Sequence, residues 1–550
     1  MSKTAVGEFT PKIFTIIKNG YKMSDLRTDA LAGLTVAIVA LPLAMALAIA
    51  SGASPDKGLV TSVVAGFMIS FLGGSRVQIG GPTGAFVVVV FNVIATHGYD
   101  GLVLATMLAG VILIVAGYAR LGRTIKFIPY PVVTGFTAGI AVIIASSQVK
   151  DFLGLRIDNL PADFIPKWGA YFTHLGNLNT SALLIGAGSF LLIAVLRKVA
   201  PRVPGYLAAV VLSSLIVTLL HLPVDTIGSR FGQIPSGLPM PELPVFSFAK
   251  FQEIIPAAFT IAFLAGIEAL LSAVVADGMT GFKHRSNQEL VGQGFANIVS
   301  AFFGGLPATG AIARTATNIR SGGRSPMSGM FHSLFLFAFM MLASNVMTYV
   351  PMTALAAILF MVAWGMSEAH RFVQIFKIGG NDRIILLLTF LLTVLVDLTV
   401  AIGVGVALAS LLFMAQMSKT VAFSSSPDDD YDQRRDLPAG VEVFSISGPV
   451  FFGVTGEMID TLKRMGQMPK VLIIRMRFVP FLDTSGVAAL EDIVRQCSKA
   501  GTRIVFSGLQ AQPQSILSRA HLGIGENTLF AKDYDDAIKD AEKIILQPLE

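Results

Sequence analysis

Cysteine and charge are both scarce in this sequence. The only cysteine among the 550 residues, Cys497, excludes an intramolecular disulfide, and no group of cysteine and histidine residues has the spacing of a metal site. Only 14% of the residues are charged, whereas a soluble globular protein has about a quarter. Hydrophobic residues make up 53% of the chain, and the mean hydropathy is +0.69. The missing charge therefore indicates a protein that lies largely within a membrane.

Apolar runs of about twenty residues, each long enough to cross a hydrocarbon core of ~30 Å, recur through the first three quarters of the chain. The first run, Leu31 to Gly52, follows a polar and basic segment and precedes many other runs, so we expect a retained span rather than a cleaved signal peptide. The pattern predicts a polytopic α-helical membrane protein with seven spans in a first repeat (29–221), a connection (222–253) and seven spans in a second repeat (254–417). The fourteen predicted spans are 29–50, 58–73, 83–96, 101–119, 128–149, 180–197, 205–221, 254–277, 289–303, 310–319, 327–345, 350–366, 384–397 and 399–417.

Lysine and arginine gather in every second loop, which is the pattern of cytoplasmic loops in a multi-pass protein of the plasma membrane. We therefore expect both termini, including the N-terminal segment 1–28, in the cytoplasm. This placement explains the net charge of +6 better than a nucleic-acid-binding face does, so no nucleic-acid partner is expected. The basic residues of these segments are Lys12, Lys18, Lys22, Arg27, Arg76, Arg120, Arg123, Lys126, Arg197, Lys198, Arg202, Lys283, Arg285, Arg320, Arg324, Arg371, Lys377, Arg383 and Lys419.

A short motif occurs twice, as FLGG at Phe71 to Gly74 and as FFGG at Phe302 to Gly305, each time just before the third span of its repeat. This spacing indicates a duplicated unit. Because each unit has an odd number of spans, the second unit must be inverted relative to the first, as in many secondary transporters.

After each motif comes a stretch interrupted by glycine and proline, QIGGPTGAFVVVV from Gln78 and LPATGAIARTATN from Leu306, whose apolar part is too short to span. We interpret both stretches as half-helices whose N-termini meet near the middle of the bilayer. Each N-terminus offers free amide groups and about half a positive charge, so two together form an anion site without a buried lysine.

Small residues at these N-termini would let an anion approach the backbone. Gly81, Gly84 and Gly310 have no side chain, Pro82 suits the first helical turn because it lacks the unused amide, and Thr83 adds a hydroxyl. The alternative is that the glycines serve only close helix packing.

Three of the ionisable residues within predicted spans are candidates for a functional or capping role. Glu268 is in the middle of AFTIAFLAGIEALLSAVVADG, where a charge is costly and usually functional, and Ser272 lies one turn further on the same face. Because burial disfavours the ionised form, we expect Glu268 to bind and release a proton during transport; the alternative is a structural ion pair or hydrogen bond. Arg314, near the second half-helix N-terminus, would add positive potential to the anion site or neutralise Glu268. Asp397 is interpreted as a helix cap at a turn.

The composition changes at a polar linker (418–438), within which SSSPDDDYDQRRD runs from Ser424 to Asp436. The remainder (439–550) predicts a small α/β domain on the cytoplasmic side. Its predicted strands are VEVFSIS, KVLIIRM and TRIVFSG, and its predicted helices are MIDTLKRM and GVAALEDIVRQCSKAG.

With these features the chain resembles the SulP family of anion transporters over nearly its whole length. The likeness rests on the fourteen spans, FxGGSR before a GPT-type third span, the GIEALLSAVVADGMTG stretch and a C-terminal STAS domain. LPLAMALAIASG, GMTGFKHRSNQELVGQG and MVAWGMSEAH look similar to the bacterial members associated with four-carbon dicarboxylates. FLDTSG, from Phe481 to Gly486, resembles the motif in which the second hydroxyl residue, here Ser485, is phosphorylated; Asp483 and Thr484 share this regulatory turn.

The resemblance implies a core domain of spans one to four and eight to eleven that moves against a gate domain of the remaining spans, often in a homodimer. It also implies a coupling role for Glu268. Sodium-coupled bicarbonate members carry aspartate at the position of Glu268 and a hydroxyl residue at that of Ile312, which favours protons over sodium here. The residues that the resemblance places around the anion are Thr83, Gly84, Ala311, Ile312 and Arg314.

We expect a proton-coupled symporter that takes up sulfate or a four-carbon dicarboxylate, such as succinate or fumarate, by an elevator-like movement. The alternatives are a sodium-coupled bicarbonate transporter, an anion exchanger, an uncoupled anion channel or a membrane-anchored signalling protein. An enzyme is not expected, because no nucleophile and base pair, metal cluster or phosphate loop occurs, and no cofactor is expected. The expected partners are a small anion, the lipid bilayer, a second copy of the chain and a cytoplasmic regulatory protein or ligand at the STAS domain.

Overall fold

The computed structural model describes most of the chain, and it divides into two compact units, Met1–Val406 and Ala407–Glu550. The described residues are 7–124, 129–157, 160–161, 163–200, 203–242, 248–396, 398–424, 437–463, 468–521 and 528–546.

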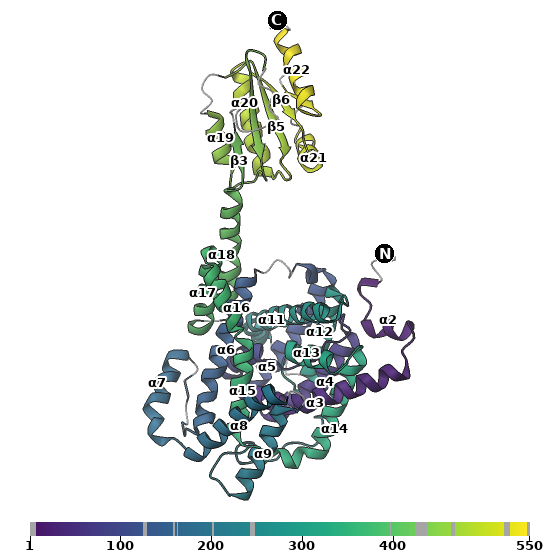
Figure 1. Cartoon of the computed structure of the whole chain (residues 1–550), viewed down its shortest axis with the longest axis vertical. Coiled ribbons are helices and arrows are strands. Elements are labelled where there is room, and N and C mark those ends of the chain that lie inside the picture. The colour runs from purple at the N-terminus through teal and green to yellow at the C-terminus, as the bar shows by residue number, and fades with distance from the viewer. Residues whose placement is uncertain are drawn as a thin grey trace. The chain divides into compact units, whose positions relative to one another are not determined.

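The first unit is a bundle of apolar helices, and the last helix, α18, runs into the second unit (Figure 1). Each of the fourteen predicted spans falls on a helix. The helices are α2 (Lys12–Lys18), α3 (Met23–Ala50), α4 (Pro55–Leu72), η1 (Gly84–Phe86), α5 (Val87–Tyr118), α6 (Tyr130–Leu153), α7 (Phe164–His174), α8 (Thr180–Val199), α9 (Gly205–Leu219), α10 (Ile227–Phe231), α11 (Phe248–Thr280), α12 (Ser286–Phe302), α13 (Ile312–Arg320), α14 (Pro326–Met347), α15 (Met352–Met366), α16 (Ala369–Ile378), α17 (Gly380–Leu395) and α18 (Leu398–Ser418).

Among the described residues, nine helices are long and apolar enough to cross a membrane unaided. Two details of the prediction are confirmed. The third and fourth spans both lie within α5, and the helix breaks between them at Gly98, where φ is 72° and ψ is 178°. The tenth span, α13, has nine residues, so it is about 14 Å long and reaches less than half of the ~30 Å hydrocarbon core, as expected of a half-helix.

The helices pack in two groups that correspond to the core and gate domains implied by the resemblance, except that α18, the fourteenth span, belongs to neither group and α16 was not a predicted span. The core group consists of α3, α4, α5, α11, α12, α13 and α14, in which α5 packs on α11 and α12 while α14 packs on α3 and α4. The gate group consists of α6, α8, α9, α15, α16 and α17, in which α6 packs on α15 and α17. The two groups meet where α3 contacts α9 and α15, and where η1 contacts α6.

Four described helices of the first unit were not predicted from the sequence. They are α2, α7, α10 and α16, and α7 lies on the outside of the helical unit (Figure 1). All four have at most eleven residues, so their apolar periodicity is too short to stand out beside the spans. Asp397, interpreted as a cap, lies outside the described residues, as do Lys126 and Arg202.

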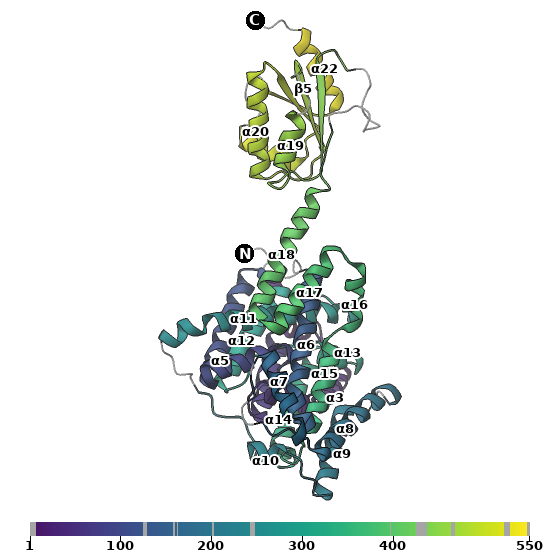
Figure 2. The ribbon, with the colours of Figure 1, turned by 90° about the vertical axis from the view of Figure 1, so that its left-hand side faces the viewer.

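The second unit contains a five-stranded sheet in the order β3-β4-β5-β6-β7, with β3 antiparallel and the other neighbours parallel. One face is covered by α19, α20 and α21 through a core that includes Phe444, Leu490 and Leu517, and the other by α22 through Ala537 and Ala541 (Figure 2). Its elements are β3 (Ala422–Ser424), β4 (Val441–Ser447), α19 (Thr455–Lys463), β5 (Val471–Phe478), α20 (Thr484–Lys499), β6 (Arg503–Ser507), α21 (Ala511–Arg519), β7 (Thr528–Ala531) and α22 (Tyr534–Leu546).

The three predicted strands and two predicted helices of this unit are present as β4, β5, β6, α19 and α20. The predicted linker is shorter than expected, because Ser424 belongs to β3 and pairs with Ser445 of β4. The rest of the charged segment, 425–436, lies outside the described residues.

Cys497 is fully buried in α20, and burial raises the pKa of its thiol to about 11. At pH 8 the thiolate fraction is then roughly a hundredfold or more below that of an ordinary thiol. We expect maleimide to label native protein at least that much more slowly than protein in denaturant. A variant with an added exposed cysteine on the same helix, Ala488→Cys, is the control and should label rapidly; fast labelling of the parent protein would contradict the burial.

Candidate functional site

Two short strands join the repeats at the positions where the half-helices were predicted to meet. In β1 (Gly80–Gly81) and β2 (Thr309–Gly310), Gly80 pairs with Gly310 and Gly81 with Thr309, antiparallel to each other. Each strand follows a helix that ends at the FxGG motif, and each precedes a half-helix, η1 running into α5 or α13. The same order of elements thus occurs in both repeats, and the sequence reasoning had predicted the half-helices but not the strands.

Side chains from the surrounding helices satisfy the backbone around these strands. The amide of Ile79 donates to Thr315 Oγ1 at 3.0 Å, and that of Ala308 donates to Asn297 Oδ1 at 2.8 Å. The amide of Leu306 donates to Thr61 Oγ1 at 2.7 Å. Because the bilayer core has no water for unpaired backbone groups, these bonds allow non-helical chain at this depth.

Glu289 of α12 supports the other end of the same loop. Its Oε2 atom accepts hydrogen bonds from the amide of Gly74 at 2.8 Å, the last residue of the first FxGG motif, and from that of Ser75 at 3.0 Å. The second repeat therefore holds the first one in place from both sides of β1.

Both half-helices begin with amides that are free in the described part of the chain. In α13 the first helical hydrogen bond runs from the amide of Thr315 to the carbonyl of Ala311, so the amides of Ile312 and the next two residues have no helical partner. In η1 the first hydrogen bond runs from the amide of Phe86 to the carbonyl of Thr83, so the amide of Gly84 likewise has no helical partner. These two N-termini are the anion-attracting features that the sequence predicted.

Two residues predicted to line the anion site have other partners. The amide of Ala311 donates to the carbonyl of Ile79 at 2.8 Å, so it is not free to bind an anion. Pro82 precedes the half-helix instead of lying in its first turn, and its carbonyl accepts a hydrogen bond from Arg314. Ala311 and Pro82 therefore shape the loop rather than offer amides.

Arg314 lies between the two half-helices and is 2% exposed. Its Nη2 donates to the carbonyl of Pro82 at 3.2 Å and its Nη1 to Ser62 Oγ at 3.4 Å, whereas its Nε has no hydrogen-bond partner among the described residues. A buried donor without a partner costs about 1–3 kcal/mol, so the guanidinium retains capacity for a ligand.

The predicted glycines make room for this arrangement. A Cβ atom at Gly81, where φ is 151°, would overlap the guanidinium of Arg314, and one at Gly310 would overlap the amide of Gln78. Close packing therefore accounts for both of these glycines, as the alternative interpretation held. Because Gly81 has no side chain, the guanidinium of Arg314 can lie directly against its backbone.

Glu268 of α11 contacts the first half-helix. Its Oε2 accepts a hydrogen bond from Thr83 Oγ1 at 2.7 Å, and its side chain is only half-buried. No salt bridge of the described residues joins Glu268 to Arg314, but the two side chains are close enough for their charges to interact, so the arginine offsets part of the negative charge of the carboxylate. The carboxyl group is therefore tied to the site both through Thr83 and through the charge of Arg314.

Ser272, one turn further along α11, faces the other half-helix. Its hydroxyl donates to Thr315 Oγ1 at 3.3 Å, which in turn accepts from the amide of Ile79. Ser272 thus connects α11 to α13 and, through Thr315, to the residue before β1.

The site lies where the core group meets the gate group. The space at the Cα of Gly84 is closed by the sulfur of Met366 from α15 and by Ile144 from α6. On the second half-helix Ile312 is 38% exposed. A change at the contact between the groups therefore alters access to the first half-helix.

Sequence reasoning did not identify the polar residues that support the site. Besides Glu289 and Asn297, His332 of α14 is completely buried, and neither of its ring nitrogens has a hydrogen-bond partner in the described part of the chain. The signal that could have found them is a polar residue inside an apolar run, the rule that identified Glu268.

In the second unit the predicted regulatory turn begins α20. Asp483 caps this helix, because its Oδ1 accepts from the amide of Gly486 at 2.7 Å, while its Oδ2 accepts from the amide of Phe452 at 3.2 Å. Thr484 is exposed and Ser485 is half-buried in the first turn. The helix N-terminus would stabilise a phosphate on Ser485.

Comparison with known families identifies both units. The family described as "Sulfate permease family" matches residues 26–389, and the STAS domain matches residues 436–533. The chain is 41% identical to the putative sulfate transporter YvdB of Bacillus subtilis, over 94% of this chain and 98% of that protein. It is 32% identical to the bicarbonate transporter BicA of a Picosynechococcus species, over 92% and 93%.

Solved structures agree with this fold. The murine anion transporter Slc26a9 in its inward-facing state matches with a TM-score of 0.88 at 19% identity, covering 99% of this chain and 95% of that one. The transmembrane domain of a cyanobacterial BicA matches with a TM-score of 0.62 at 33% identity, covering 70% and 99%. None of these four descriptions names a dicarboxylate, so the resemblance to dicarboxylate-type members has no support.

Proposed function

The chain belongs to the sulfate permease family of anion transporters, and we propose that it is a secondary transporter that takes up sulfate together with protons. Arg314 carries this proposal, because its buried guanidinium has an unused donor beside two helix N-termini. Charge-assisted hydrogen bonds to an oxyanion are about twice as strong as neutral ones. The relative with 41% identity is a putative sulfate transporter, which supports the same anion.

Movement of the core group against the gate group would expose this site to each side of the membrane in turn. Gly84 lies against Met366 and Ile144 at the contact between the groups, so a displacement there uncovers or covers the first half-helix. Both half-helices belong to the core group and are joined by β1 and β2, so the anion would travel with that group. By the distribution of basic loops we place both termini in the cytoplasm.

Glu268 is the group proposed to carry the proton. A carboxyl group that contacts Thr83 at the start of the first half-helix senses whether an anion is bound there. Ile312 offers no oxygen to a sodium ion, which favours protons as the coupling ion. Bicarbonate is the second candidate substrate, because a bicarbonate transporter is 32% identical over nearly the whole chain.

The proposal is tested with purified protein in proteoliposomes. We expect radiolabelled sulfate uptake to follow an inward proton gradient and to be unaffected by a sodium gradient of equal size. Bicarbonate and succinate are compared as competitors under the same gradients. Sodium-driven uptake, or uptake of bicarbonate without sulfate competition, would refute proton-coupled sulfate transport.

Ser485→Glu places a negative charge in the first turn of α20, next to the exposed side chains of Phe452 and Phe481. If this turn is regulatory, we expect the variant to change the transport rate at least twofold with an unchanged substrate affinity, because the site lies in the other unit. Ser485→Ala is the control for loss of the hydroxyl. Equal rates for all three proteins would leave Asp483 and Thr484 with a capping role only.

A further inference from the structure

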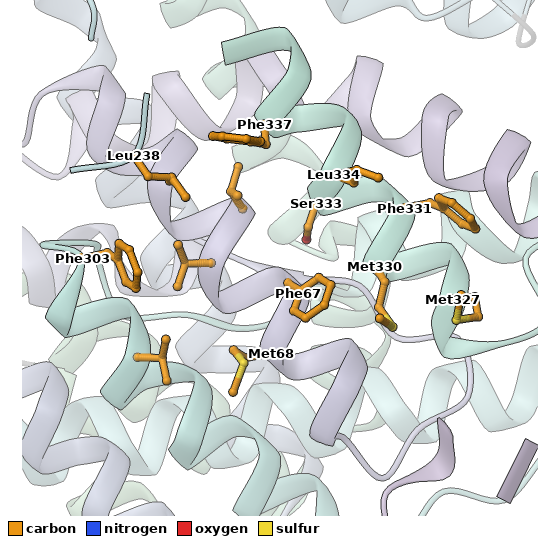
Figure 3. Close-up of a pocket in the computed structure, with 13 residues that line it drawn as sticks. Phe67, Met68, Leu238, Phe303, Met327, Met330, Phe331, Ser333, Leu334 and Phe337 are labelled. Atoms are coloured by element: carbon orange, nitrogen blue, oxygen red, sulfur yellow. The ribbon is translucent and has the colours of Figure 1, made fainter. Parts of the chain in front are cut away.

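An apolar groove lies on the core group, and its lining includes none of the residues of the anion site. It has a volume of about 430 Å³ and opens between α4, α12 and α14, with Leu238 closing one end. In Figure 3 its lining runs from Met327 and Phe331 at one end to Leu238 and Phe303 at the other. The only polar residue in the lining is Ser333, whose hydroxyl donates to the carbonyl of Ser62 at 3.1 Å. A polar ligand would therefore be desolvated there without compensation.

The position and length of the groove fit one lipid chain. Both α4 and α14 are apolar enough to cross a membrane, and Leu334 in the groove wall is 57% exposed on an apolar surface. From Met327 to Phe337 the groove follows ten residues of α14, about 15 Å of helix. This length equals one leaflet of a ~30 Å hydrocarbon core.

Aromatic side chains extend the groove toward α2, a short helix that packs on α4 and α14. Phe67 in the groove wall stacks on Phe71, and Phe71 meets Phe14 of α2 edge to face. Phe14 and Ile17 are exposed on α2, whose last residue is Lys18. An amphipathic helix of this kind lies at the membrane surface.

The α2 end of the groove is positively charged. Arg324 is exposed three residues before Met327, and its amide donates to Asp29 of α3 at 2.8 Å, which brings the start of α3 to the same end. The other exposed cations here are Lys18, Lys22 and Arg27, and no salt bridge of the described residues includes any of the four. The acidic residues at this end are Asp25 and Asp29, and Asp29 is buried with hydrogen bonds from Tyr21 and Ser325.

We propose that this groove binds an acyl chain of one anionic phospholipid, whose phosphate lies at Arg324 and the basic residues of α2 and α3. The apolar lining, the length of one leaflet and the charge at one end each fit this ligand. Ser62 connects the groove to the anion site. Its carbonyl accepts a hydrogen bond from Ser333 in the groove lining, and its hydroxyl accepts one from Arg314. An occupied groove would therefore hold α4 and α14 together behind the arginine.

The test measures lipid retention, which does not depend on whether the protein transports sulfate. Protein is reconstituted in phosphatidylcholine nanodiscs containing phosphatidylglycerol with the same acyl chains, and retained lipid is counted by native mass spectrometry. Val299→Trp fills the groove and should abolish retention, whereas Val274→Trp, on an exposed apolar face of α11, should not. Phe67→Ala removes part of the wall and should lower retention even if the tryptophan variant fails to fold.

Arg324→Gln should reduce the preference for phosphatidylglycerol over phosphatidylcholine about fivefold, the effect of one cation near an anionic headgroup. Lys198→Gln, at an exposed cation of the gate group, is the matched control and should have no effect. Equal retention of both lipids by the parent protein, or undiminished retention in Val299→Trp and Phe67→Ala, would refute the proposal. Disulfide crosslinking of two copies through Leu334→Cys would instead identify the groove as a contact between copies and also refute it.

Discussion

Glu268→Gln is expected to abolish sulfate uptake driven by a proton gradient while exchange of sulfate across the membrane continues. Glutamine has nearly the size of glutamate, and its carbonyl oxygen can still accept the hydrogen bond from Thr83. It cannot take up or release a proton, so the gradient no longer acts on the carrier. The measurement compares uptake and counterflow, each with and without an inward proton gradient.

Glu253→Gln is the matched control, because Glu253 is an exposed glutamate on the same helix. A structural role for Glu268 predicts either a loss of both activities together or no loss at all. Full gradient-driven uptake in a well-folded Glu268→Gln protein would contradict the proposed role.

Arg314→Ala is expected to lower the affinity for sulfate about ten- to hundredfold. Hydrogen bonds to a charged group contribute about 1.5–3 kcal/mol, and both helix N-termini remain to give residual binding. Isothermal titration calorimetry with sulfate measures this loss directly.

Loss of the arginine also frees the carbonyl of Pro82 and the hydroxyl of Ser62, so a second variant separates charge from packing. Arg314→Lys keeps the positive charge but cannot make the two hydrogen bonds together, so it should give an intermediate affinity. Arg320→Ala, which removes an exposed arginine of the same helix, is the control. Parent-like binding by Arg314→Ala would show that this arginine only packs the loop.

The spans could be predicted because their signal is local. Most are long apolar runs, and the structure begins and ends most of these helices within a few residues of the predicted bounds, as in α15, predicted at 350–366 and found at Met352–Met366. The break at Gly98 lies between the predicted spans 83–96 and 101–119, but its sharp change of backbone direction could not be read from the hydropathy.

The sequence predicted which residues form the candidate site better than it predicted the contacts between them. Glu268 was chosen because a charge is expensive within a bilayer, and Thr83 and Arg314 because they lie near the predicted half-helix N-termini. The structure brings all three to the half-helices. The partners of each group could not be read from the sequence. Glu289 accepts a hydrogen bond from the amide of Gly74, although the two residues are 215 positions apart in the sequence. The strands β1 and β2 have only two residues each, so they have no periodicity to detect.

The pairing of β1 with β2 can form only after a delay during synthesis of the chain. Ile79 and Thr315, which close the joint, are 236 residues apart. At 5–20 residues per second, synthesis of the intervening chain takes roughly 10 to 50 s. During that interval the backbone of the first broken helix has none of its partners from the second repeat, and in a bilayer each unpaired group is costly. The first repeat must therefore wait near the insertion machinery or in contact with water, and a ribosome that stalls before residue 309 leaves a membrane-inserted fragment that is exposed to proteolysis.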